Sequence, residues 1–135
     1  MYDNLIMNNN KIAIVTGGNR GIGLGITQSF IEAGYTVFVG ALKDRNLEET
    51  FGDKVVFVPT DVRQEQAHHD LVQLATEKCG RLDVYVNNAG YSFWKPITEI
   101  DDAFLGDLLD TNLKGAFWGC KAAASVMHSN AAIIN

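Results

Sequence analysis

The segment Thr16-Gly17-Gly18-Asn19-Arg20-Gly21-Ile22-Gly23 joins an apolar run, Ile12–Val15, to a helix predicted over residues 22–33. A buried strand, a glycine-rich turn and a helix N-terminus in this order form an anion site. The free N–H groups at the helix start face the ligand along the favourable end of the helix dipole. We therefore expect a phosphate group at this turn, and an ordinary glycine-rich loop is the alternative.

The spacing of the glycines narrows the kind of ligand. Gly17, Gly21 and Gly23 follow the pattern T-G-x-x-x-G-x-G, which differs from the common dinucleotide fingerprint G-x-G-x-x-G. No Lys-Ser or Lys-Thr pair follows the glycines, so the segment is not a Walker A loop. The pattern favours a phosphate of a bound dinucleotide over that of a hydrolysed triphosphate.

Composition excludes several classes of function. The chain has 135 residues, enough for one domain, and a net charge of −5, which argues against a nucleic-acid partner. Cys79 and Cys120 form neither a disulfide framework nor a metal spacing, and no metal site is expected. No apolar run reaches the length of a membrane span. Residues 1–10 are predicted to be a disordered polar leader without signal-peptide features, which together with reduced thiols favours a cytoplasmic protein.

Strand and helix patterns alternate from residue 11 onward, which predicts βαβ units around a parallel sheet. Strands are expected at residues 12–16, 35–41, 55–58, 82–86 and 131–135, and helices at 22–33, 44–51, 64–78 and 98–127. Right-handed crossovers give the sheet order third, second, first, fourth, fifth. This is a doubly wound, Rossmann-like α/β fold with three αβα layers, cut off at the start of its fifth strand. Residues 11–135 would form one partial domain.

Two details of the helices are also predicted. The first helix is expected to bury a stripe of Ile22, Ile26, Phe30 and Ala33. The three histidines lie in helical patterns away from the expected ligand crevice, and we interpret them as surface residues.

Four motifs occur in a recognisable order. They are TGGNRGIG (16–23), Asp61-Val62 after the third strand, NNAG (87–90) after the fourth, and TNLKG (111–115) in the long helix. Together they resemble the short-chain dehydrogenase/reductase family of NAD(P)-dependent oxidoreductases. The resemblance covers residues 11–135.

The resemblance implies roles for particular residues. Gly17, Gly21 and Gly23 would shape the pyrophosphate turn, Ile22 would offer a backbone N–H, and Asn19 and Arg20 belong to the same loop. Asp61 would accept a hydrogen bond from the adenine amino group, with Val62 offering its backbone, although a cap on the next helix is the alternative for Asp61. Asn87 would brace the sheet, while Asn88, Ala89 and Gly90 would lie beside the cofactor. Asn112 would support a proton relay to the catalytic lysine.

The catalytic residues of the family are a Ser and a Tyr-x-x-x-Lys pair, and the resemblance places all three after Asn135. We expect none of Tyr2, Tyr35, Tyr85 and Tyr91 to replace the missing tyrosine, so the chain alone is predicted to be inactive. The sequence is interpreted as the cofactor-binding part of a longer oxidoreductase. The alternative is a non-catalytic dinucleotide-binding or regulatory module.

NADP is favoured over NAD. The second strand closes at Ala41, where a carboxylate would bind the 2′-hydroxyl of NAD. Arg20 and Lys43 or Arg45 would supply positive charge for a 2′-phosphate. The predicted substrate is a small carbonyl compound or alcohol, beside Tyr91, Phe93 and Trp94 or with these aromatics serving only as packing. The family often pairs through the long helix, which predicts a homo-oligomer.

Overall fold

The computed structural model describes residues 10–135, so the predicted leader, apart from residue 10, lies outside the described residues. One sheet contains five strands, and each neighbouring pair is parallel. The strands are β1 (Ile12–Thr16), β2 (Thr36–Ala41), β3 (Val55–Pro59), β4 (Val84–Val86) and β5 (Ala132–Ile134). Their order is β3-β2-β1-β4-β5, which confirms the predicted topology. The change of direction between β1 and β4 creates the switch point at which such sheets bind ligands.

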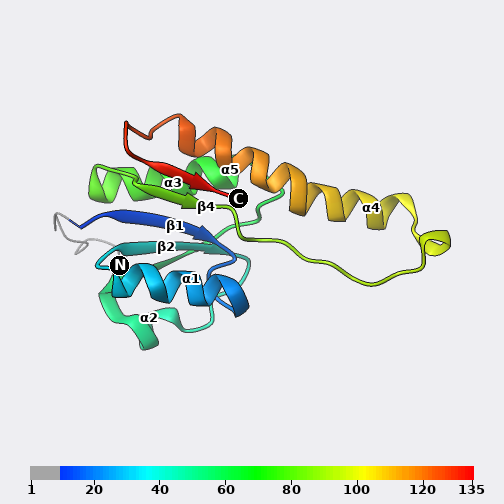
Figure 1. Ribbon diagram of the computed structural model, residues 1–135, viewed down its shortest axis with the longest axis horizontal. Helices are drawn as coiled ribbons and strands as arrows, with labels where there is room; N and C mark the ends of the chain where they lie inside the picture. Colours follow the sequence, from blue (N-terminus) through cyan, green and yellow to red (C-terminus); the bar gives the residue numbers. More distant parts are fainter. Residues whose placement is uncertain (1–9) are drawn as a thin grey trace.

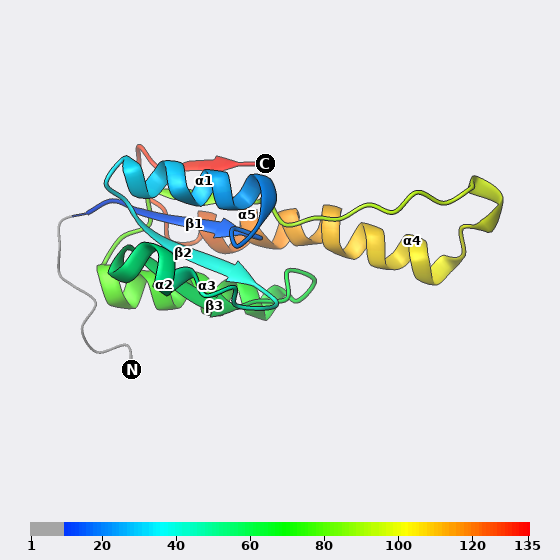
Figure 2. The ribbon, with the colours of Figure 1, turned by 90° about the horizontal axis from the view of Figure 1, so that it is seen from below.

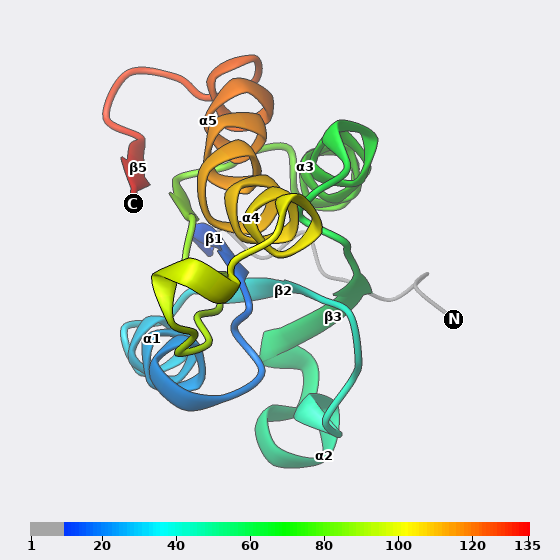
Figure 3. The same cartoon turned by 90° about the vertical axis from the view of Figure 1, so that its right-hand side faces the viewer.

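Helices cover both faces of the sheet. They are α1 (Gly21–Glu32), α2 (Leu47–Phe51), α3 (Glu65–Cys79), α4 (Asp102–Leu109) and α5 (Gly115–Ala124), with short 3₁₀ turns at Gly52–Lys54 and Ile97–Glu99. Figure 3 shows α1 and α2 on one side of the sheet and α3, α4 and α5 on the other. The predicted three-layer α/β fold is therefore confirmed.

Each face of the sheet has its own apolar core, because alternate strand residues point to opposite sides. Phe38 and Tyr85 pack with Leu71 of α3 on one face. On the other face, Val39 packs in the cluster that contains Ile31 of α1 and Leu47 of α2. The residues of β1 are all buried, as expected for the central strand of a parallel sheet.

The buried face of α1 differs from the predicted stripe. Gly23, Thr27 and Ile31 are buried, whereas the Ile22 side chain is 81% exposed. Thr27 donates a hydrogen bond to the Gly18 carbonyl at 2.9 Å, which turns this small-residue face toward the glycine-rich turn. Ile26 and Phe30 of the predicted stripe are half-buried and pack against the core, whereas Ile22 and Ala33 are exposed, so the apolar pattern was right in part.

The predicted helix over residues 98–127 begins later and changes its winding. Asp101 caps α4 by accepting a hydrogen bond from the Phe104 N–H at 2.8 Å. A π-helical turn, Asp110–Lys114, then separates α4 from α5. Figures 1 and 2 show α4 extending beyond the end of the sheet, with the segment after β4 running alongside it. Exposed apolar side chains follow this helical rod at Leu105, Leu109, Leu113 and Phe117.

Within residues 10–135, none of the helices combines the length and the apolar character needed to cross a bilayer.

Candidate functional site

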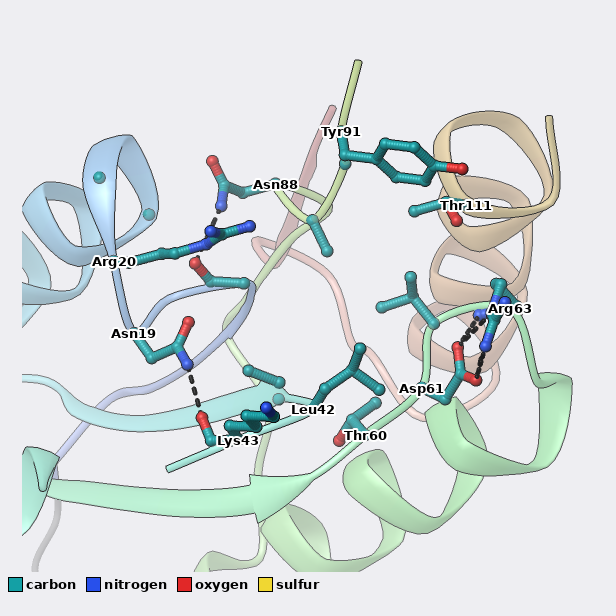
Figure 4. Close-up of a pocket in the computed structure, with 18 of the residues that line it drawn as sticks. Asn19, Arg20, Leu42, Lys43, Thr60, Asp61, Arg63, Asn88, Tyr91 and Thr111 are labelled. Atoms are coloured by element: carbon teal, nitrogen blue, oxygen red, sulfur yellow. Dashed lines mark hydrogen bonds and ion pairs between the residues drawn. The ribbon is translucent and has the colours of Figure 1, made fainter. Parts of the chain in front are cut away.

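A cavity of 890 Å³ lies at the carboxyl edge of the sheet (Figure 4). Its size is within the usual range of small-molecule sites, about 300–1,000 Å³. All twelve residues predicted to bind a cofactor line it: Gly17, Asn19, Arg20, Gly21, Ile22, Gly23, Lys43, Asp61, Val62, Asn88, Ala89 and Gly90. Three motifs that are far apart in the sequence therefore meet at one cavity.

The glycine-rich turn is tightly curled. Gly17 has φ of +64°, a backbone conformation that residues other than glycine rarely adopt. Its N–H donates to the Gly40 carbonyl of β2 at 2.7 Å. A Cβ on Gly23 would overlap the Gly17 carbonyl and the Asn88 amide. Glycine at these positions lets the helix begin directly against the turn, which brings the backbone N–H groups to the cavity.

Hydrogen bonds from the turn after β4 hold it against the glycine-rich turn. The Thr16 hydroxyl accepts from the N–H groups of Asn88 and Ala89, both at 3.1 Å. The Asn88 amide donates to the carbonyls of Thr16, at 3.0 Å, and Gly17, at 3.3 Å. These contacts fix the distance between the two walls of the cavity. Asn88 thus acts here through its side chain as well as its backbone.

Lys43 and Arg45 follow β2 at one end of the cavity, and Arg20 lies in the glycine-rich turn. Arg20, Lys43 and Arg45 all line it, and β2 ends at Ala41 with no carboxylate at that position. The Asn19 amide donates to the Lys43 carbonyl at 2.6 Å, which ties the segment after β2 to the glycine-rich turn. This end of the cavity is therefore suited to a negatively charged group.

The β3 end carries two carboxylates and an arginine. Arg63 lies against Asp61, with Nη2 and Oδ2 at 2.8 Å, and its Nη1 is 3.3 Å from Asp107 of α4. The hydrogen bond from Arg63 holds the pKa of the Asp61 carboxyl below its usual value. The capping alternative for Asp61 fails, since the N-cap of α3 is Gln64 and no side chain caps that helix.

His68 is fully buried, so the prediction that all three histidines lie at the surface was wrong. Its Nε2 is 2.9 Å from the Val62 carbonyl and its Nδ1 is 2.7 Å from the Tyr85 hydroxyl. The carbonyl can only accept, so Nε2 carries the proton and Nδ1 accepts from Tyr85. His68 precedes Leu71 and Val72 at helical spacing, and this signal identifies it as part of the buried face. His69 is half-buried and His128 is exposed.

The burial of His68 predicts a pH-dependent stability. Desolvation lowers the pKa of His68 below its ordinary value of 6.5, so the folded state binds fewer protons than the unfolded state. The stability contributed by neutral His68 is full above pH 6.5 and is lost as the pH falls below it. Thermal unfolding at about pH 7.5 and about pH 5.5 should show a smaller acid-induced loss in His68→Leu than in the control His69→Leu. Equal acid-induced losses of stability in the two variants would contradict a lowered pKa for His68.

Asn112 lies beside the cavity and does not line it. Its Oδ1 accepts from the Tyr91 N–H at 2.9 Å and its Nδ2 donates to the Tyr91 carbonyl at 2.7 Å. These two bonds explain how an asparagine is accommodated in the π-helical turn. They anchor the segment that follows Gly90 to the helix.

One tyrosine of this chain does have a lysine four residues later. Lys95 follows Tyr91 by four residues, so a Tyr-x-x-x-Lys spacing does occur in this chain. Residues 91–96 are not helical, however, and the spacing does not bring the two side chains onto one helix face. The Lys95 ammonium instead lies 5.1 Å from the Phe104 ring centre and 4.0 Å from Asp101. Tyr91 and Phe93 line the cavity, whereas Trp94 is 90% exposed and does not.

Several lining residues were not predicted, among them Thr60, Arg63, Asp107 and Thr111. Thr60 and Arg63 flank Asp61-Val62, and Thr111 opens the TNLKG motif, so proximity to the motifs was an available signal. Asp107 had none, because only the packing of α4 brings it to Arg63. Between residues 10 and 135, no group of three or more His, Cys, Asp or Glu is arranged to hold a metal ion.

Comparison with known proteins decides the family. The sequence profile of the short chain dehydrogenase family matches residues 11–135. The chain belongs to the short-chain dehydrogenase family. Members of this family bind NAD or NADP, and the cavity lies where the fold places such a ligand.

Two curated proteins are similar in sequence to this chain. The L-2,3-butanediol dehydrogenase of Corynebacterium glutamicum is 34% identical over 122 residues, which are 84% of this chain and 47% of that protein. The (S)-acetoin-forming diacetyl reductase of Staphylococcus epidermidis is 35% identical over 121 residues, which are 85% of this chain and 47% of that protein. The chain thus spans about half the length of these relatives.

A solved structure supports the assignment. A Sinorhizobium meliloti 1021 protein assigned as a short-chain alcohol dehydrogenase superposes with a TM-score of 0.78 and is 37% identical. The match covers 86% of this chain and 48% of that one.

Proposed function

We propose that this chain is the NADP(H)-binding part of an oxidoreductase that transfers hydride between the nicotinamide ring and a small carbonyl compound or alcohol. One observation carries the proposal: the glycine-rich turn, the end of β2, Asp61-Val62 and the NNAG turn line a single cavity at the switch point of the sheet. The cofactor would supply the hydride, and this chain would bind and orient it.

The proposed placement of the dinucleotide follows the chemistry of the cavity walls. The pyrophosphate would lie at Gly17–Gly23, where α1 begins, because free N–H groups and the helix dipole favour an anion there. The adenine would lie at the β3 end, with its amino group donating to Asp61 and its ring near Val62. The nicotinamide half would lie toward Asn88, Ala89 and Gly90.

The cations that line the cavity lead us to propose NADP over NAD. Arg20 and Lys43 would bind the 2′-phosphate, and Arg45 would add to the positive field. We expect the chain to bind NADPH at least about tenfold more tightly than NADH, measured by calorimetric titration. Arg20→Gln and Lys43→Gln should each weaken NADPH binding about tenfold and change NADH binding little.

Lys54→Gln is the control, since Lys54 lies at the opposite end of the sheet, next to the start of β3. The NADP proposal fails if NADH binds as tightly as NADPH, or if the control weakens NADPH as much as the two cavity variants.

The remaining parts of the proposal concern the whole protein. The two relatives are named for butanediol, diacetyl and acetoin, which supports a small carbonyl or alcohol substrate here. We propose that the Ser and Tyr-x-x-x-Lys groups of the family belong to a part outside these 135 residues, and that Asn112 supports their proton relay. This chain alone would then not turn over.

We also propose a homo-oligomer and a cytoplasmic location. The exposed row of Leu105, Leu109, Leu113 and Phe117 supports an oligomer, because apolar side chains gathered on one helical face are typical of an interface.

A further inference from the structure

The pairing of Asp61 with Arg63 has a consequence for recognition of the base. Arg63 directs three donors at the Asp61 carboxylate. Its backbone N–H lies 3.1 Å from Oδ1, its Nε lies 3.0 Å from Oδ1 and 3.2 Å from Oδ2, and Nη2 lies 2.8 Å from Oδ2. Figure 4 shows the two side chains facing each other at one end of the cavity. This bidentate fork fixes the plane of the carboxylate as a single hydrogen bond would not.

The fork leaves the carboxylate able to bind another donor. Oδ1 accepts from two of these donors, whereas Oδ2 accepts from Nη2 and only shares the more distant Nε, so Oδ2 retains acceptor capacity for a further donor. The Asp61 side chain is 28% exposed and lines the cavity, so a ligand can reach it. The free acceptor site is therefore presented in one orientation to whatever lies at the β3 end.

Arg63 also balances the charge of this end of the cavity. Its Nη1 lies 3.3 Å from Asp107, so one guanidinium stands between two carboxylates on the same rim. Without it, both carboxylates would repel the phosphates of a dinucleotide. Orientation and charge balance act in the same direction, since each favours binding.

We propose that Arg63 is a positioning residue that gives the site its preference for adenine over other purines, by fixing the carboxylate of Asp61 for the 6-amino group. This rests on the proposed function, in which Asp61 accepts a hydrogen bond from adenine. A purine that carries a 6-oxo group offers the carboxylate a second acceptor and is rejected. The 6-oxo purine is rejected strongly only while the Asp61 carboxylate cannot rotate away from it. The hydrogen bonds from Arg63 prevent that rotation.

The test compares two ligands on the same 135-residue chain: NADPH and its reduced hypoxanthine analogue, which has an oxo group in place of the 6-amino group. The ratio of their dissociation constants is the readout. General damage to the fold weakens both ligands and leaves the ratio unchanged, so the ratio isolates recognition of the base.

We expect the unmodified chain to prefer NADPH at least about tenfold, because a site built around a substrate N–H group rejects an analogue that lacks it. Arg63→Gln should reduce this ratio about three- to tenfold. Arg63→Lys should restore the overall affinity for both ligands but not the ratio, since an ammonium keeps the charge and lacks the planar fork. Asp61→Asn should abolish the preference.

Arg81→Gln is the matched control. Arg81 forms the same kind of pair with Asp83, at 2.9 and 2.6 Å, but neither residue lines the cavity. The ratio of the two dissociation constants in Arg81→Gln should equal that of the unmodified chain. A full adenine preference in Arg63→Gln would overturn the inference and leave the proposed function intact. An unmodified chain that binds both analogues equally would overturn the assignment of Asp61 and the inference with it, and a chain that binds neither would overturn the proposed function as well.

Discussion

Gly21→Asp is expected to weaken dinucleotide binding at least about 100-fold, which corresponds to about 2.7 kcal/mol of binding free energy. Gly21 is the first residue of α1 and lines the cavity, so the new carboxylate would stand where the pyrophosphate is proposed to bind. Two negative groups would then compete for the same helix N-terminus. Calorimetric titration of the variant with NADPH measures the change in affinity.

Two controls separate charge from backbone strain. Gly21 has φ of +52°, a conformation that Asn tolerates, so Gly21→Asn tests the conformation without the charge and should lose less than about tenfold. Gly25→Asp adds the same charge one helical turn later, at a position that does not line the cavity, and should bind normally. If Gly21→Asp binds NADPH as well as the unmodified chain, the phosphate does not bind at this turn.

The second large effect is expected on stability, at the buried pair of His68 and Tyr85. His68→Leu would leave the Tyr85 hydroxyl and the Val62 carbonyl without partners in the interior, at a cost of about 2–4 kcal/mol in the free energy of unfolding. Tyr85→Phe removes only the hydroxyl and should cost about 1–2 kcal/mol. Urea unfolding of the variants gives these values.

The double variant tests whether the two residues act as a pair. It removes both polar partners of their shared bond, so its loss should be smaller than the sum of the single losses by roughly 1 kcal/mol. The control His69→Leu alters the adjacent, partly exposed histidine and should change stability by less than about 0.5 kcal/mol. A His68→Leu variant as stable as this control would show that the buried hydrogen bonds contribute nothing.

Much of the fold could be predicted from the sequence because its signals are local. Short apolar runs bounded by glycine, proline and polar residues marked all five strands. The handedness of the crossovers then left one strand order. The residues that line the cavity could be brought together for the same reason: most belong to a contiguous motif at a strand end, and a parallel sheet brings those ends to one edge.

The features that could not be predicted depend on contacts between distant residues. The two hydrogen bonds that satisfy the ring of the buried His68 are made with Val62 and Tyr85, and neither partner is adjacent to it in sequence. The π-helical turn around Asn112 depends on Tyr91, 21 residues earlier. Likewise, Thr27 of α1 is buried with its hydroxyl bonded to the Gly18 carbonyl, while the apolar Ile22 is exposed. In each case the polar partners lie outside the local sequence pattern.

The central claim is that one cavity at the carboxyl edge of the sheet binds NADP(H). The most direct test is to titrate the isotopically labelled chain with NADP⁺ and to follow the backbone amide resonances by NMR. We predict saturable shifts concentrated at residues 17–23, 41–45, 60–63 and 87–90. Shifts at the amino edge of the sheet, or no saturable shift at all, would contradict it.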